Sequence, residues 1–85
     1  MKIIGLINPV APFQEIYVYE NGNKVDVVNS KVDMIADTVI NLAKRYNVSD
    51  IELFGAKSYA AGISKQIQEA ELSMYNKNVL NITIK

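Results

Sequence analysis

Residues 13–28, which read FQEIYVYENGNKVDVV, decide the fold of this chain. Two β-prone runs, Phe13 to Glu20 and Lys24 to Val28, flank the pair Asn21-Gly22. Asparagine and glycine tolerate positive φ, so Asn-Gly between such runs favours a two-residue type I′ turn. The stretch therefore predicts an antiparallel β-hairpin.

A two-residue turn also predicts the register of the hairpin, because residues at equal distances from the turn are paired. Paired residues share one face of a sheet. The pairs are Tyr19 with Lys24, Val18 with Val25, Tyr17 with Asp26, and Ile16 with Val27. One face is expected to carry Ile16, Val18, Val25 and Val27, and the other Tyr17, Tyr19, Lys24 and Asp26.

Upstream of the hairpin, the run Lys2-Ile3-Ile4-Gly5-Leu6-Ile7 reads as the first strand, over about residues 2–8. It is apolar on both faces, which is typical of a central strand of a sheet. Pro9 and Pro12 cannot donate ladder hydrogen bonds, so this strand is expected to stop at Asn8.

Downstream of the hairpin, Ser30 is expected to cap a first helix. Asn47 is expected to take the left-handed conformation that ends it. Apolar residues recur there at three- and four-residue steps, which predicts one buried stripe. The stripe consists of Val32, Ile35, Ala36, Val39, Ala43 and Tyr46. A short strand, Ile51 to Phe54, follows and ends at Gly55.

Residues 58–74 predict a second helix, and Val79 to Ile84 a last strand. The stripe of this helix consists of Tyr59, Gly62, Ile63, Ile67, Ala70 and Met74. Gly62 is expected to allow close approach to the sheet or to the other helix. Glu69 and Glu71 are expected to lie on a solvated face.

The predicted order is therefore β-β-β-α-β-α-β in a single domain, residues 1–85, of the α/β (α+β) class. Each helix links two strands that are expected to be parallel, and the hairpin adds an antiparallel extension. The expected architecture is a mixed five-stranded sheet with both helices mainly on one face.

Composition narrows the classes of function. The chain of 85 residues has nine basic and nine acidic side chains and no cysteine or histidine. Nucleic-acid binders usually carry a basic excess, so that partner is not favoured. A zinc site lacks its usual cysteine and histidine ligands, and thiol chemistry lacks its cysteine. No cofactor is expected. The N-terminal apolar run is too short for a signal peptide or a membrane span, so a cytoplasmic protein without a membrane partner is expected.

The element order resembles the ribonuclease-H-like fold, and the start is similar to its Holliday-junction resolvase branch. In that branch the first strand often ends in Asp-Pro-Gly, where this chain has Asn8-Pro9-Val10. An amide is a poor ligand for the metal ions of such nucleases. The family's second acid falls near Leu53-Phe54-Gly55, and its last acid lies on a further helix beyond Lys85. The resemblance thus implies a degenerate scaffold with no catalytic or metal-binding residues. The small cysteine-free chain also resembles accessory proteins of bacteriophages, which would place it in a host cytoplasm.

Two groups of residues are candidate sites. Phe13, Tyr17, Tyr19 and Lys24 form an aromatic row that can anchor a protein partner or stack bases, or serve only as cross-strand packing. Gly55, Lys57 and Ser58 join a strand to a helix, where backbone amides can hold an anion. The simpler interpretation of this second group is a tight turn with Ser58 as N-cap.

The leading hypothesis is a small non-catalytic interaction or assembly module that self-associates as a dimer or binds a protein partner. If both helices cover one face of the sheet, the aromatic face is bare in a monomer. A nucleic-acid binder using Lys24, Tyr17 and Tyr19 is an alternative. A metal-dependent nuclease is another, and it requires Asp33, Asp37 or Glu52 to converge near Asn8.

Overall fold

The computed structural model describes residues 2–6 and 13–85, and the expected β-β-β-α-β-α-β order is confirmed. The candidate position Asn8 and the rest of residues 7–12 lie outside the described residues. The elements are β1 (Lys2–Leu6), β2 (Phe13–Glu20), β3 (Asn23–Lys31), a 3₁₀ turn η1 (Val32–Met34), α1 (Ile35–Tyr46), β4 (Asp50–Leu53), α2 (Lys57–Tyr75) and β5 (Asn81–Ile84).

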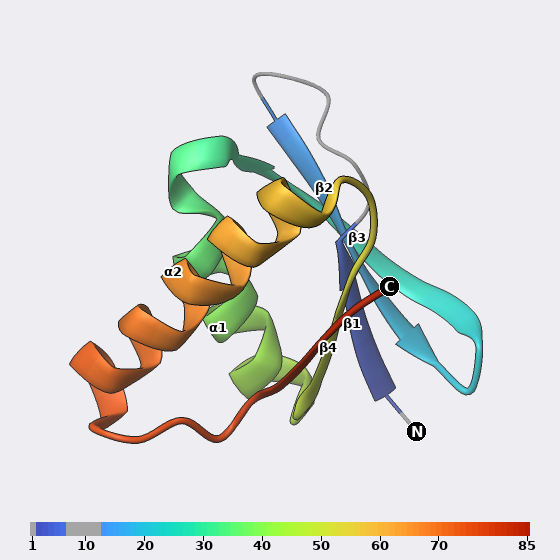
Figure 1. Ribbon diagram of the computed structural model, residues 1–85. Coiled ribbons are helices and arrows are strands. Elements are labelled where there is room, and N and C mark those ends of the chain that lie inside the picture. The colour runs from blue at the N-terminus through green and yellow to red at the C-terminus, as the bar shows by residue number, and fades with distance from the viewer. Residues whose placement is uncertain (1, 7–12) are drawn as a thin grey trace.

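The five strands form one mixed sheet in the order β3-β2-β1-β4-β5. The central strand is β1, as its apolar sequence predicts, and it is antiparallel to β2 and parallel to β4. Strand β5 is parallel to β4 at the far edge. Both helices cover the same side of the sheet (Figure 1). We call the helix-covered side the inner face and the opposite side the outer face.

The core lies between the inner face and the two helices. Alternate residues of β2, Ile16 and Val18, are fully buried there, because strand side chains alternate between the two faces. The predicted stripe of α1 is confirmed, since each of its residues is buried in the core or packs against it. Asn47 ends α1 with φ of 55°, as expected. No helix of the described residues is long and apolar enough to cross a membrane.

The predicted register of the hairpin is right only beside the turn. Tyr19 pairs with Lys24, but Val18 pairs with Asp26, Tyr17 with Val27, and Ile16 with Val28. An irregularity beside Val18 leaves Val25 as an extra residue in β3, in the manner of a β-bulge. The shift by one residue moves Val27 to the outer face, where Val25 and Val27 are 50% and 47% exposed.

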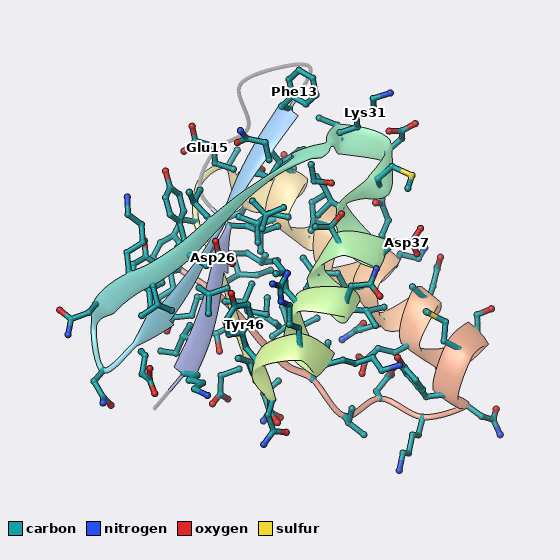
Figure 2. All side chains as sticks on the ribbon, turned by 180° about the vertical axis from the view of Figure 1, so that it is seen from behind. Phe13, Glu15, Asp26, Lys31, Asp37 and Tyr46 are labelled. Atoms are coloured by element: carbon teal, nitrogen blue, oxygen red, sulfur yellow. The ribbon has the colours of Figure 1, made fainter. Side chains whose placement is uncertain are left out.

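The bulge turns Asp26 toward the helices instead of toward the aromatic face. Its carboxylate accepts a hydrogen bond from the Tyr46 hydroxyl at the end of α1. Figure 2 shows the two side chains pointing toward one another from β3 and α1. This bond lowers the pKa of Asp26, helped by the Val27 backbone N–H, and raises the pKa of Tyr46.

Ser30 is not a helix cap, because β3 continues to Lys31. Its buried hydroxyl lies 2.9 Å from the Thr38 hydroxyl of α1 and donates to the Lys31 carbonyl. The helix itself begins at Ile35, after η1. Strand β3 therefore includes Ser30 and Lys31, which the sequence had assigned to the start of the first helix.

Helix α2 differs from its predicted form in three respects. Ala56, not Ser58, occupies its N-cap. Apart from its neighbours and the backbone of its own helix, no described atom lies within 4 Å of a Cβ built at Gly62, so this glycine permits no close approach. Glu71 is buried rather than solvated, whereas Met74 of the predicted stripe is exposed. At this end of α2, Glu71 and the hydroxyl of Tyr75 are buried, so the helix turns that side inward and leaves Met74 exposed.

Candidate interaction surface

The outer face carries the aromatic row that the hairpin sequence predicts. Tyr17 and Tyr19 alternate with the buried Ile16 and Val18, and their ring centroids are 6.0 Å apart with a tilt of 32°. The Lys24 ammonium lies 4.8 Å from the centroid of the Tyr17 ring, within the range of a cation–π contact. Three of the predicted residues therefore form one contiguous group.

Phe13 extends the row at the start of β2, where it is exposed and pairs with Lys31 of β3 (Figure 2). Glu15 lies between Phe13 and Tyr17 on the same face and accepts a hydrogen bond from the Tyr17 hydroxyl. That bond, with burial and the Glu15 charge as smaller causes, raises the pKa of Tyr17. The Tyr17 hydroxyl is therefore neutral at physiological pH and held against β2.

Phe54 is a member of this surface that the sequence prediction missed. It follows Leu53 at the end of β4 and turns its ring over the centre of the outer face. A Cβ built at Gly5 would lie 3.0 Å from Tyr19 Cε2 and 3.7 Å from Phe54 Cε2. The absence of a side chain at Gly5 lets both rings lie close to β1. Strand alternation after the buried Leu53 is the sequence signal that could have found Phe54.

An open depression of about 390 Å³ lies beside these rings. It is lined by Tyr19, Gly22, Glu52 and Phe54. The Glu52 carboxylate forms an ion pair of 3.2 Å with the Lys85 ammonium. The outer face thus combines apolar rings with charges of both signs, and no described helix or strand covers it. We define the outer surface as Phe13, Tyr17, Tyr19, Lys24, Val27, Glu52 and Phe54.

The second candidate site, Gly55, Lys57 and Ser58, lies at the N-terminal end of α2. Gly55 has φ of 117°, a conformation that suits glycine. Lys57 and Ser58 are the first residues of the helix, and both are exposed. Anion binding there stays a prediction, although Ser58 does not provide the expected cap.

The acids that a nuclease site requires do not come together. Glu52 pairs with Gly5 on the outer face, while Asp37 lies on α1 on the other side of the sheet (Figure 2). Within residues 2–6 and 13–85, no three acidic side chains form a group that could hold a metal ion.

No protein-family model and no curated protein matches the sequence. Among solved structures, a Bacteroides thetaiotaomicron protein described as having an actin-like ATPase fold and unknown function is similar to this chain. The TM-score is 0.69 at 12% sequence identity, and the similarity covers 99% of this chain. The chain spans only 32% of that protein. At this identity the similarity shows a shared fold alone.

The similar structure supports a mixed sheet, which the ribonuclease-H-like resemblance also implies. The similar structure carries an actin-like ATPase fold instead, which is related in being built on a mixed sheet. Nothing in the comparison points to a resolvase or to a bacteriophage.

Proposed function

We propose that this chain is a small non-catalytic interaction module, built on a ribonuclease-H-like scaffold, that self-associates through its outer surface. The element order and the strand order β3-β2-β1-β4-β5 support the scaffold. The observation that carries the function is the bare aromatic face, where Tyr17, Tyr19 and Phe54 lie opposite both helices. Contiguous apolar patches of this kind mark interaction sites.

The charge distribution favours a second copy of the chain as the partner. The chain has no net charge, so two copies do not repel one another. Its outer face carries both Glu15 and Glu52 and both Lys24 and Lys85. A two-fold interface brings the same patch of each copy together, and a patch with both signs can complement itself.

The size of the sheet is also compatible with a dimer. Five strands at about 4.8 Å spacing and about six residues of 3.3 Å give a flat area on the order of 500 Å². Side-chain relief adds to this area. A standard interface buries about 800 Å² on each partner, so most of the outer face has to take part.

Analytical ultracentrifugation with a charge substitution tests the proposal. Wild type is expected to dimerise at micromolar concentration, and Val27→Lys, on the edge strand β3 beside Tyr17 of the outer surface, to raise the dimer Kd at least tenfold. Met74→Lys is the matched control, because Met74 is an equally exposed apolar residue on α2. A strict monomer at high micromolar concentration, or equal dimerisation of the two variants, would contradict the proposal.

Nucleic-acid binding is the second candidate, favoured by the tilted Tyr17 and Tyr19 rings with Lys24 beside them. Such rings stack on single-stranded bases. A gel shift with single-stranded DNA that weakens with salt and is lost in Tyr17→Ala supports this function. The absence of a shift at low salt excludes it.

A further inference from the structure

A separate concave site lies on the helix side of the sheet. It occupies the space between the C-terminal ends of α1 and α2 and the segment that leads into β5, and its volume is about 200 Å³. Ile40, Val48 and Leu80 contribute apolar walls, and Lys44, Glu71 and Tyr75 contribute polar groups. None of these residues belongs to the outer surface.

Glu71 is the decisive residue of this cavity, because it is a carboxylate that is only 1% exposed. Its Oε2 atom accepts hydrogen bonds from the backbone N–H groups of Val79 and Leu80, at 3.0 and 3.2 Å. Its Oε1 atom is buried and accepts no hydrogen bond from the described residues. A buried acceptor without a donor is costly, so this position favours a ligand that supplies one.

Tyr75 adds a second buried polar atom one turn further along α2. Its hydroxyl finds no hydrogen-bond partner among the described residues. The Lys44 ammonium lies 5.2 Å from the centroid of its ring, so the mouth of the cavity already accommodates an ammonium group. Lys44 is exposed and is free to turn into solvent when another cation enters.

The two helix ends also favour a cation. Helix α1 ends at Asn47 and helix α2 at Asn76, and each cap has left-handed backbone angles. The C-terminal end of a helix carries a partial negative charge. Two such ends and the Glu71 carboxylate add negative charge beside this cavity, which the Lys44 ammonium at its mouth partly balances.

We propose that the cavity binds a small organic ammonium compound with an apolar body. The ammonium donates to Glu71 Oε1 and to the Tyr75 oxygen, and the body lies against Ile40, Val48 and Leu80. The terminal torsion of a glutamate is broad, so a modest rotation turns Oε1 toward the cavity. A cavity of about 150 Å³ holds benzene, so a ligand of four to six carbon atoms is about the right size.

Amide NMR titration of the full chain tests this site, with n-butylammonium as the probe. Saturable shifts are expected at Tyr75, Val79 and Leu80. 1-Butanol and butyrate, which match its size without the positive charge, are expected to bind at least tenfold more weakly. This readout does not depend on dimerisation, so its failure leaves the proposed function untouched.

Glu71→Gln removes the charge and keeps an oxygen that can accept from the Val79 and Leu80 N–H groups. It is expected to weaken n-butylammonium binding at least tenfold. Glu69→Gln is the matched control, since Glu69 is exposed on the same helix and pairs only with Lys65 at 4.0 Å. Its affinity is expected to equal that of wild type.

Tyr75→Phe provides a second variant that removes one hydroxyl and retains the ring, and it is expected to weaken binding severalfold. It keeps the test decisive if Glu71→Gln fails to fold. Equal binding of n-butylammonium and 1-butanol, or unchanged affinity in the folded variants, means that Glu71 and Tyr75 do not recognise an ammonium group and overturns the proposal. No saturable shift with n-butylammonium also overturns it.

Discussion

The inner and outer faces of the sheet are built from alternate residues of the same strands, yet their surroundings differ. In β2, Ile16 and Val18 are fully buried under the helices, while their neighbours Tyr17 and Tyr19 are partly exposed on the outer face, with ring centroids 6.0 Å apart. The inner face therefore supplies the stability of the monomer. The outer face carries large, partly exposed side chains that no described helix or strand covers.

The largest expected effect comes from comparing substitutions at Ile16 and Val27, which lie on opposite faces of neighbouring strands. Ile16→Ala leaves a cavity in the core and is expected to lower the free energy of unfolding by about 2–5 kcal/mol. Val27→Ala is expected to stay within about 0.5 kcal/mol of wild type. Urea denaturation at a concentration where the chain is monomeric measures both, and similar losses would show that the outer face is covered.

A smaller effect is expected at the centre of the outer face. Gly5→Ala places a Cβ 3.0 Å from the Tyr19 ring, and crowding of this kind typically costs about 1–3 kcal/mol. Gly62→Ala is the matched control, since no described atom is near and alanine is the better helix former by about 1 kcal/mol. Thermal melts are expected to show opposite shifts. A neutral Gly5→Ala would mean that the Tyr19 ring moves freely.

The smallest effect concerns Asp26, the polar residue that the bulge turns toward the helices. The Tyr46 hydroxyl holds the pKa of Asp26 below its ordinary value of 3.8. A carboxyl with a lowered pKa stabilises the folded state above the ordinary value and loses that contribution as the pH falls through the lowered pKa. Tyr46→Phe is therefore expected to reduce Tm near neutral pH and to match wild type in strong acid.

A pH series of melting temperatures checks this expectation, with Tyr46→Phe and Asp26→Asn measured in parallel. The two variants remove the same bond from opposite sides, so their differences from wild type are expected to shrink together as the pH falls. A difference that stays constant across the acid range would assign the loss to packing instead of to the ionised bond.

Periodicity predicted the parts of the fold that depend on burial. The stripe from Val32 to Tyr46, the central apolar β1 and the left-handed Asn47 follow from local patterns, because each has one dominant physical cause. The register of β3 does not, since the extra residue Val25 leaves the turn chemistry of Asn21-Gly22 unchanged. Tertiary contact between Asp26 and Tyr46, twenty residues apart, accompanies the shifted register.

Only part of the candidate surface could be predicted, because alternation within one strand is local whereas the pairing of two strands is not. Tyr17 and Tyr19 follow from alternation in β2, whereas Phe54 joins them only because β4 lies beside β1. Glu71 was missed altogether, since a glutamate near Glu69 on a helix reads as solvated. Its partners, the Val79 and Leu80 amides, were assigned to the last strand by its alternation, whereas β5 begins only at Asn81 and leaves these amides to bond Glu71.

The central place of β1 has a consequence during synthesis of the chain. One of its edges pairs with β2, which follows soon after, but the other waits for β4, whose residues end at Leu53. Ribosomes add about 5–20 residues per second, so the hairpin side can form seconds before β4 emerges. In that interval an apolar strand edge is open to any nascent neighbour, and chaperone occupancy on the ribosome is expected to peak there.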